Sequence, residues 1–176
     1  MLVVHLNEMQ KIFETKRLFL RKLTLNDVAA LVDFFADADA MRYLPATKNI
    51  DEIKEWISLV QKSYDHYGYG PWALIHKFSN QFLGYCGLCV QEDIDGNDEI
   101  EILYGLIRQN WDKGYASEAA IGVYEYGKDR LDINRFVSLI EPENIRSIKV
   151  AEKIGMEPRN NINRWGRKYC VYSIGI

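Results

Sequence analysis

The spacing of apolar residues changes along the chain, and each spacing predicts a different kind of element. Residues 15–22 alternate between apolar and polar positions, which indicates a β-strand. Residues 24–37 and 49–68 repeat at helical spacing instead. Thr24 and Asp27 have the separation of a helix-capping hydroxyl and carboxylate, and the second segment opens on a similar pair. The pattern therefore predicts a strand followed by two helices.

A run of alternating segments follows, over residues 72–76, 82–90 and 99–107. Polar turns at residues 77–81 and 93–98 separate the three segments. Short alternating runs joined by polar turns are typical of an antiparallel meander.

The remainder of the chain mixes helical and extended patterns. We expect a helix over 117–130, a strand over 135–140, a helix over 145–154 capped by Gly155, and strands near 157–162 and 168–174. This order predicts an α+β fold with a mixed, mostly antiparallel sheet of about seven strands and helices on both faces. The strands before and after the first of these helices should run parallel, so that their carboxyl ends open on one crevice, where ligands bind.

The segment 108–116 lies between a predicted strand and a predicted helix and faces that crevice. Gly114 and Ala116 are small residues at the point where the helix begins. A glycine there lets main-chain N–H groups face a ligand, and the helix dipole favours an anion. We therefore expect a ligand that carries phosphate at residues 111–117.

Composition narrows the class of protein. The chain has 176 residues, of which 48% are hydrophobic and 27% charged, with a net charge of -3, as in an ordinary single globular domain. The absence of a basic excess disfavours nucleic acid as a partner. No apolar run approaches the ~18 residues of a membrane-spanning helix. We expect a cytoplasmic protein without a membrane partner, and the three cysteines agree with a reducing compartment.

Two apparent motifs are set aside. Cys86 and Cys89 have the spacing of half a metal site, but an odd separation within a strand directs the two side chains to opposite faces, and no second pair completes a site. We expect no metal. Residues 122–129 approach a phosphate-binding P-loop, but Asp129 stands where Ser or Thr would bind magnesium. That segment also lies within a predicted helix, so its glycines are interpreted as packing positions or weak points of that helix.

Three segments together resemble the GNAT superfamily of acetyl-CoA-dependent N-acetyltransferases: residues 101–106 (EILYGL), 111–119 (WDKGYASEA) and 143–156 (ENIRSIKVAEKIGM). Residues 15–21 (TKRLFLR) and Asp27 are most similar to the RimJ/RimL branch, whose members acetylate the N-termini of ribosomal proteins. The resemblance covers residues 15–176, which implies one N-acetyltransferase domain of the GNAT fold after an N-terminal extension, residues 1–14.

The resemblance implies a site for acetyl-CoA. In the family, the strand end binds the pantetheine arm through its backbone, which here assigns Leu106, Ile107 and Arg108. The loop binds the pyrophosphate through its N–H groups, which assigns Trp111, Asp112, Lys113, Gly114, Tyr115, Ala116 and Ser117, and Asn144 joins the cofactor site. Asp112 stands where the branch commonly has Gly. Its carboxylate should repel a diphosphate unless it points outward, and Lys113 or Arg108 can offset the charge.

A splay between the strands 99–107 and 135–140 admits the pantetheine arm in the family, and Gly105 is a candidate for the irregularity that allows it. The alternative is that Gly105 is only a weak point of the strand.

Catalysis requires a base for the amine and a proton for the leaving thiolate. The resemblance implies Glu101 as the general base, while a solvated carboxylate is the alternative. The superfamily's Tyr proton donor is replaced by Ala151, and the branch has Ser at the position of Ser147. Ser147 is therefore the candidate donor. Asn144 and Ser147 also have the spacing of a helix N-cap, which is the structural alternative.

The expected reaction is direct transfer of an acetyl group from acetyl-CoA to a primary amine, on a protein N-terminus or a small molecule. A polyamine or aminoglycoside acceptor is one alternative, and a non-catalytic coenzyme A sensor or scaffold is another. Candidates for the acceptor pocket are Tyr43, Tyr67, Tyr69 and Trp72, with Trp72 more typical of a core and Trp165 assignable to either role. A homodimer is one option that the sequence leaves open.

Overall fold

The computed structural model describes residues 11–44 and 46–175. Most of the predicted N-terminal extension, residues 1–10, lies outside the described residues, as does Pro45 in the loop between the first two helices. The last part of that extension forms a strand, β1 (Lys11–Glu14), which pairs antiparallel with β2 (Leu18–Lys22). The sheet therefore begins before the predicted first strand.

Two strands and two α-helices come first, three consecutive strands follow, and helices and strands then alternate up to a final pair of strands. The remaining strands are β3 (Pro71–His76), β4 (Phe82–Ile94), β5 (Asn97–Leu106), β6 (Arg135–Ile140), β7 (Glu157–Arg164) and β8 (Arg167–Gly175). The helices are the 3-10 turns η1 (Leu25–Asp27) and η2 (Arg108–Asn110), and the α-helices α2 (Val28–Ala36), α3 (Ile50–Tyr67), α4 (Tyr115–Leu131) and α5 (Ile145–Ile154).

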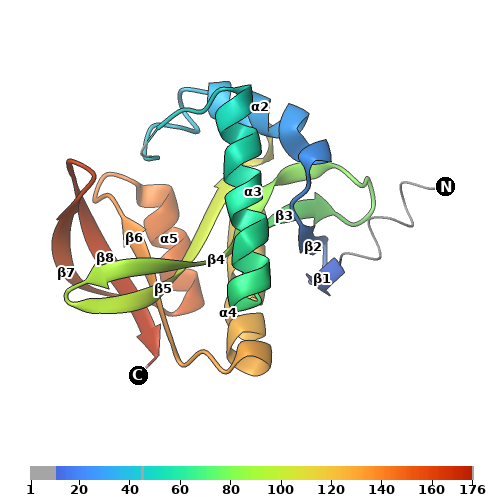
Figure 1. The fold of residues 1–176 in the computed structure, drawn as a ribbon. Helices are drawn as coiled ribbons and strands as arrows, with labels where there is room; N and C mark the ends of the chain where they lie inside the picture. The colour runs from blue at the N-terminus through green and yellow to red at the C-terminus, as the bar shows by residue number, and fades with distance from the viewer. Residues whose placement is uncertain (1–10, 45, 176) are drawn as a thin grey trace.

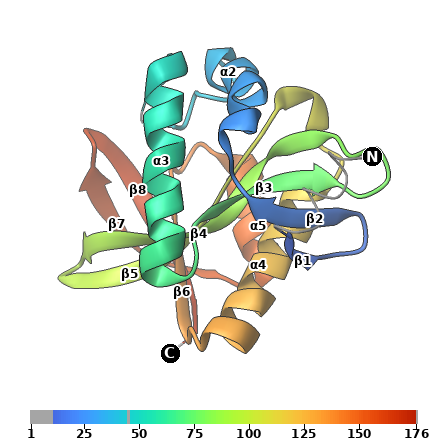
Figure 2. The same cartoon turned by 45° about the vertical axis from the view of Figure 1, so that its right-hand side comes forward.

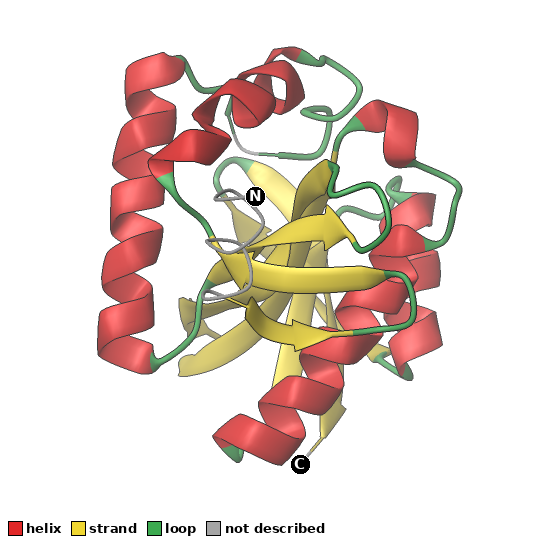
Figure 3. Ribbon diagram, turned by 90° about the vertical axis from the view of Figure 1, so that its right-hand side faces the viewer, coloured by secondary structure: helices red, strands yellow, loops and turns green. Residues whose placement is uncertain are grey.

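All eight strands form one sheet in the order β1-β2-β3-β4-β5-β6-β8-β7, in which only β5 and β6 run parallel. The predicted mixed, mostly antiparallel sheet and its parallel pair are confirmed, and the strand absent from the prediction is β1. Helices α2 and α3 cover one face and α4 and α5 the other, as Figures 1 and 2 show in two orientations and Figure 3 shows edge-on, with the sheet between the helices. Among the described residues, no helix has the length and apolar character needed to cross a membrane.

Local capping chemistry explains where the helices begin and end. The N-cap Asn49 accepts hydrogen bonds from two N–H groups of the first turn of α3, and Gly68, with φ 80°, ends that helix. The predicted pair Thr24 and Asp27 also interact, with the Thr24 N–H donating to Asp27 Oδ2 at 2.9 Å. That pair caps η1, which leads into α2, and the Asp27 carboxylate is buried against Arg21.

The turn between β4 and β5 is tighter than predicted. Strand β4 continues to Ile94, whose side chain is buried, so the predicted turn 93–98 shrinks to a hairpin tip. Asp93, Asp95 and Gly96 have positive φ angles there. Short acidic side chains and glycine tolerate this left-handed conformation, which is why the strand can extend into a polar segment.

Glycines in the sheet and in α4 make room for aromatic rings. A Cβ at Gly105 would lie 2.6 Å from Phe34 Cζ, and β5 keeps its register with β4 at this residue. Gly105 therefore marks the close approach of α2 and not a bulge. A Cβ at Gly127 would lie 2.8 Å from Phe136, and one at Gly122 would lie 2.9 Å from Phe13, so both helix glycines are packing positions.

Candidate active site

The connection from β5 to α4 forms the predicted strand, turn and helix start. Gly114 is the N-cap of α4 with φ 78°, and Asp112 is also left-handed with φ 57°. The first internal bond of the helix joins the Glu118 N–H to the Gly114 carbonyl. Within residues 11–44 and 46–175, no acceptor is recorded for the N–H groups of residues 113–117. Free N–H donors at the positive end of a helix are suited to bind a diphosphate, so the loop fits the predicted cofactor.

The loop is held to the other end of the chain by Glu118, in the first turn of α4. Its carboxylate accepts hydrogen bonds from Thr15 Oγ1 (2.6 Å), from the Arg17 N–H (2.7 Å) and from Arg17 Nε (2.6 Å). Arg17 also donates to the Lys113 carbonyl and lies over the Tyr115 ring. Burial raises the pKa of the Glu118 carboxyl, but the bonds from Thr15 and Arg17 outweigh burial and lower it overall. Sequence reasoning missed this anchor, because its partners lie about a hundred positions apart.

The charged side chains around the loop pair with residues outside it, and these pairs direct Asp112 and Arg108 away from the loop's N–H groups. The Asp112 side chain is 74% exposed and lies 3.4 Å from Arg146 of α5, so it points outward. Arg108 does not offset Asp112, as proposed from sequence, because it pairs with Asp39 at 2.6 Å. The Arg146 guanidinium also lies over the Trp111 ring. The predicted repulsion between Asp112 and a diphosphate is therefore reduced by orientation and by Arg146.

Several main-chain groups at the end of β5 are already hydrogen-bonded within the protein. The Ile107 N–H donates to the Leu83 carbonyl, and the Ile107 carbonyl accepts from Asn110. Both main-chain groups of Ile107 therefore have partners within the protein, and only the second lone pair of its carbonyl is left for the pantetheine arm. The Leu106 carbonyl accepts from the Trp111 indole at 2.8 Å. Main-chain groups alternate in direction along a strand, so the Leu106 N–H faces β6 and stays available.

Strands β5 and β6 separate directly after Glu101, which supports the predicted splay. Their only registered pair among the described residues is Glu101 with Val137. Beyond that pair the Glu101 side chain takes the place of the backbone ladder, because its Oε1 accepts from the Leu139 N–H at 3.1 Å. The Ser138 hydroxyl also bridges the two strands through a side chain, by donating to the Ile102 carbonyl at 2.8 Å. The Glu101 carboxylate therefore lies at the point where the two strands separate.

The Glu101 carboxylate is not freely solvated. Its Oε2 accepts from Gln91 Nε2 at 2.6 Å and lies 3.6 Å from Cys89 Sγ. Burial raises the pKa of Glu101 above its ordinary value, and the bonds from Leu139, Gln91 and Cys89 lower it less than burial raises it. A buried carboxylate with a raised pKa is a stronger base than an exposed one, which suits proton abstraction. Glu101 is half-buried, and these contacts hold its carboxylate within the protein, which argues against the solvated alternative.

Helix α5 separates the two interpretations of Ser147. Asn144 Oδ1 accepts from the Ser147 N–H at 3.2 Å, so Asn144 is the N-cap that the sequence predicted. The cap uses only the backbone of Ser147, whereas its hydroxyl is a hydrogen-bonding neighbour of the Tyr104 hydroxyl. Tyr104 donates from its hydroxyl to the Ser147 carbonyl at 3.3 Å, and burial raises the pKa of this tyrosine. Ala151, where the superfamily has Tyr, is buried.

The segment 37–44, between α2 and α3, connects the two sides of the cleft. Asp39 pairs with Arg108 after β5, and Tyr43 donates from its hydroxyl to the Glu143 carbonyl, next to α5. The Tyr43 hydroxyl therefore lies beside the start of α5. Of the other predicted pocket residues, Trp72 has 0% exposed surface and belongs to the core, as its alternative interpretation held.

The two cysteines of the CxxC pattern face opposite sides of the sheet, as predicted. Cys86 lies opposite Tyr104, and Cys89 lies opposite Glu101. Burial raises the pKa of both thiols, so neither is a ready nucleophile. In the residues that the structure describes, no three His, Cys, Asp or Glu side chains gather at a metal-binding distance.

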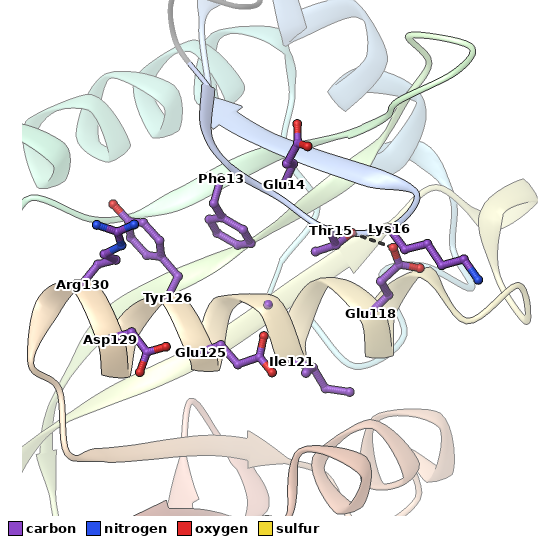
Figure 4. A pocket seen from close by; sticks show the side chains of 11 residues that line it. Phe13, Glu14, Thr15, Lys16, Glu118, Ile121, Glu125, Tyr126, Asp129 and Arg130 are labelled. Carbon is purple, nitrogen blue, oxygen red and sulfur yellow. Dashed lines mark hydrogen bonds between the residues drawn. The ribbon is translucent and has the colours of Figure 1, made fainter.

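A separate groove of about 450 Å³ runs between β1 and α4. Figure 4 shows its lining, with Phe13 and Tyr126 on one side and Thr15 bonded to Glu118 at the end near the loop. The ring of Phe13 stacks on Tyr126 at 5.0 Å. The groove holds neither Glu101 nor Ser147, so it is a packing seam beside the loop and not the catalytic cleft.

Comparison with known proteins agrees with this geometry. The model of the family described as "Acetyltransferase (GNAT) domain" matches residues 17–157, which include the loop, Glu101 and all of α5. The chain belongs to the GNAT acetyltransferase family. It is therefore an acetyl-CoA-dependent N-acetyltransferase, and its fold is the GNAT fold.

Similar proteins match the chain over nearly its whole length. The uncharacterized protein YkkB of Bacillus subtilis (strain 168) is 36% identical over 159 residues, with 90% of this chain and 92% of that protein covered. The uncharacterized N-acetyltransferase p20 of Bacillus licheniformis is 30% identical over 168 residues, covering 92% and 93%. The ribosomal L7/L12 alpha-N-protein acetyltransferase RimL, solved in complex with coenzyme A, superimposes with a TM-score of 0.80 at 19% identity, covering 95% and 98%.

Proposed function

We propose that this GNAT protein transfers the acetyl group of acetyl-CoA to a primary amine by direct attack, with Glu101 as the general base. The observation that carries the proposal is the position of the Glu101 carboxylate, at the opening of the cleft and with a raised pKa. The loop that carries free N–H groups follows the same strand, so the base and the anion site are built on one element.

Each step of the reaction has a candidate residue. Glu101 removes a proton from the acceptor ammonium or, through a water, from the attacking amine. The amine nitrogen forms a bond to the thioester carbonyl carbon, and the carbon–sulfur bond breaks. The hydroxyl of Ser147 is the candidate donor to the thiolate, because Asn144 caps the helix through the Ser147 N–H and not through that hydroxyl.

Cofactor binding is assigned to main-chain groups of the loop. The N–H groups of residues 113–117 bind the pyrophosphate, with Trp111 and Asp112 forming the turn that presents them. Leu106 offers its N–H to the pantetheine arm. Arg108 and Asn144 complete the proposed cofactor site, with the Arg108 side chain paired to Asp39 and the Asn144 side chain capping α5.

The acceptor is a protein N-terminus or a small amine. The likeness of residues 15–21 to the RimJ/RimL branch supports a protein N-terminus as the acceptor. The structural similarity to RimL shows that the two proteins share a fold. Tyr67 is the last residue of α3 and stacks on Tyr69, and α3 lies with α2 on the face of the sheet to which Glu101 points. Tyr43 donates from its hydroxyl to the Glu143 carbonyl.

The test is release of free thiol from acetyl-CoA with a panel of N-terminal peptides, polyamines and aminoglycosides. We expect at least one primary amine to support turnover, and Glu101→Gln to lower kcat at pH 7 far more than it weakens coenzyme A binding. Glu99→Gln is the matched control, because Glu99 lies on the same strand and pairs with Arg135 away from the cleft. Binding of coenzyme A without turnover of any amine would favour the non-catalytic sensor instead.

A further inference from the structure

The β7–β8 hairpin presents side chains on the face of the sheet that carries Glu101. Val137 lies opposite Glu101, and it packs with Val171 and Ile162 in a small apolar cluster on that face. Side chains two positions apart along a strand share a face. Tyr169, two residues from Val171 and paired with Ile162, therefore points to the same side as Glu101.

Arg164 extends this row to the hairpin tip. It lies two residues beyond Ile162 on β7 and is paired with Arg167 of β8. One of its terminal nitrogens, Nη1, donates to the Glu92 carbonyl of β4 at 2.8 Å, which directs the side chain back across the sheet towards β4. Its charge lowers the pKa of Glu101, so the two groups are close enough to interact.

Two polar atoms in this row are buried without a partner. The Tyr169 side chain is 3% exposed, and its hydroxyl has no hydrogen-bond partner within residues 11–44 and 46–175. Arg164 Nε is also buried without a partner in the same ranges. Buried polar groups are nearly always paired, and each exception requires an explanation such as a missing ligand. Both atoms lie on the hairpin that closes the Glu101 side of the cleft.

The chemistry of the two atoms restricts the ligand. An arginine Nε–H can only donate a hydrogen bond, and a tyrosine hydroxyl donates readily. The complement of two donors on one face of the hairpin, one of them cationic, is an oxygen atom with free lone pairs. A second ammonium group, as in a polyamine, would be repelled. Within the described residues, neither atom is hydrogen-bonded to the neighbouring Glu141, whose Oε1 accepts from Arg167 at 2.7 Å.

We propose that Arg164 and Tyr169 bind an oxygen of the acceptor next to its amine, so that the acceptor is an α-amino carbonyl compound. The oxygen belongs to the carboxylate of a free amino acid or to the first peptide carbonyl of a chain N-terminus. Both sources share one chemistry, an amine and an oxygen acceptor on adjacent carbons, with the amine at Glu101 and the oxygen at the hairpin. This inference rests on the proposed acetyl transfer and names its substrate class.

The test compares acceptors that differ only in the oxygen. Leucinamide carries the amine and a neutral carbonyl, leucine carries a carboxylate, and isoamylamine has the same side chain and neither group. In the wild type, kcat/KM should be higher for at least one oxygen-bearing acceptor than for isoamylamine, each rate being expressed per free amine. A leucine-initiated peptide compared with leucine distinguishes a chain N-terminus from a free amino acid.

Variants assign the preference to the two side chains. Tyr169→Phe should lower kcat/KM for the preferred oxygen-bearing acceptor about tenfold and leave isoamylamine unchanged, because one hydrogen bond is lost. Arg164→Lys keeps the charge but removes Nε–H, and the same selective loss is expected. Tyr172→Phe is the control, since Tyr172 is on the same strand but packs in the core on the opposite face.

The outcomes separate the claims. A selective loss in either variant supports the inference, and an unchanged preference in both overturns it. Equal losses for all acceptors overturn it as well, by indicating a general structural role. Tyr169→Phe should not lower the melting temperature, because its hydroxyl has no partner to lose; if that variant does not fold, Arg164→Lys decides. Acetylation of all amines at equal rates refutes only this inference, whereas no acetylation of any amine refutes the proposed function.

Discussion

Glu118 offers a sharp test of how the cofactor loop is held. Its carboxylate accepts three hydrogen bonds, two at Oε1 from Thr15 and the Arg17 N–H and one at Oε2 from Arg17 Nε. In Glu118→Gln the amide oxygen can keep the two bonds at Oε1. The amide nitrogen would then face Arg17 Nε–H, so two donors would oppose each other at a distance of 2.6 Å in the wild type.

The expected cost follows from these contacts. A hydrogen bond to a charged group contributes about 1.5–3 kcal/mol, and a neutral one about 1 kcal/mol. The Arg17 side chain is 36% exposed and that of Glu118 is 17% exposed, so water screens part of the pair. We therefore expect Glu118→Gln to lower the free energy of unfolding by about 2 kcal/mol. For a chain of this size that corresponds to a fall in Tm of about 4–8 °C.

The assay is urea unfolding at pH 7, followed by tryptophan fluorescence, with an unchanged slope as the sign of an intact transition. Glu125→Gln is the matched control, because Glu125 is exposed on the same helix and should change stability by less than about 0.5 kcal/mol. Loss of Glu118 also frees Arg17 from the Lys113 carbonyl, so coenzyme A should bind about fivefold more weakly. A stability change in Glu118→Gln no larger than in the control would refute this account of the anchor.

The pH dependence of the same group has a definite sign. The folded-state pKa of Glu118 is lowered from an ordinary value of 4.5. A depressed carboxyl pKa stabilises the fold above the unfolded pKa, and this contribution is lost as the pH falls through the folded value. The difference in stability between wild type and Glu118→Gln should therefore be full at pH 7 and should shrink as the pH is lowered below 4.5.

Four further outcomes are expected. Gly114→Val should abolish the rise in Tm caused by coenzyme A, because φ 78° costs a β-branched residue about 1–2 kcal/mol or more; an unaltered rise would remove the loop from the cofactor site. Asp112→Asn should tighten coenzyme A binding about two- to fivefold at low salt and less at high salt, since a charge beside the diphosphate is removed, whereas weaker binding would show that the carboxylate is needed. Ser147→Ala should slow turnover and change stability by less than about 0.5 kcal/mol, because the cap uses only the Ser147 backbone, and unchanged kcat would exclude its hydroxyl as the donor. The acid limb of kcat/KM should lie above pH 4.5, because burial raises the pKa of Glu101 and the base must be ionised; Glu101→Gln should lack that limb.

Much of the fold was readable from local chemistry. Strand β6 and helix α5 have the predicted bounds, and α3 lies between its predicted cap Asn49 and Gly68. These elements are specified by side chains within a few residues of each other, through periodicity and capping. The elements that differ from prediction are those in which tertiary contacts decide. Strand β1 exists because β2 pairs with it, and β4 extends to Ile94 because that side chain is buried.

The candidate site divides in the same way. The sequence by itself determined the loop with Gly114, the parallel pair of strands beside it and the family resemblance that selected Glu101 and Ser147. Only the tertiary structure showed that the Glu101 carboxylate bridges to the Leu139 N–H and that both main-chain groups of Ile107 have partners within the protein. The physical reason is that glycine conformation and helix capping depend on neighbours in sequence. The pKa of a carboxyl, the pairing of a charge and the lack of a partner for Tyr169 depend on groups brought together from distant positions.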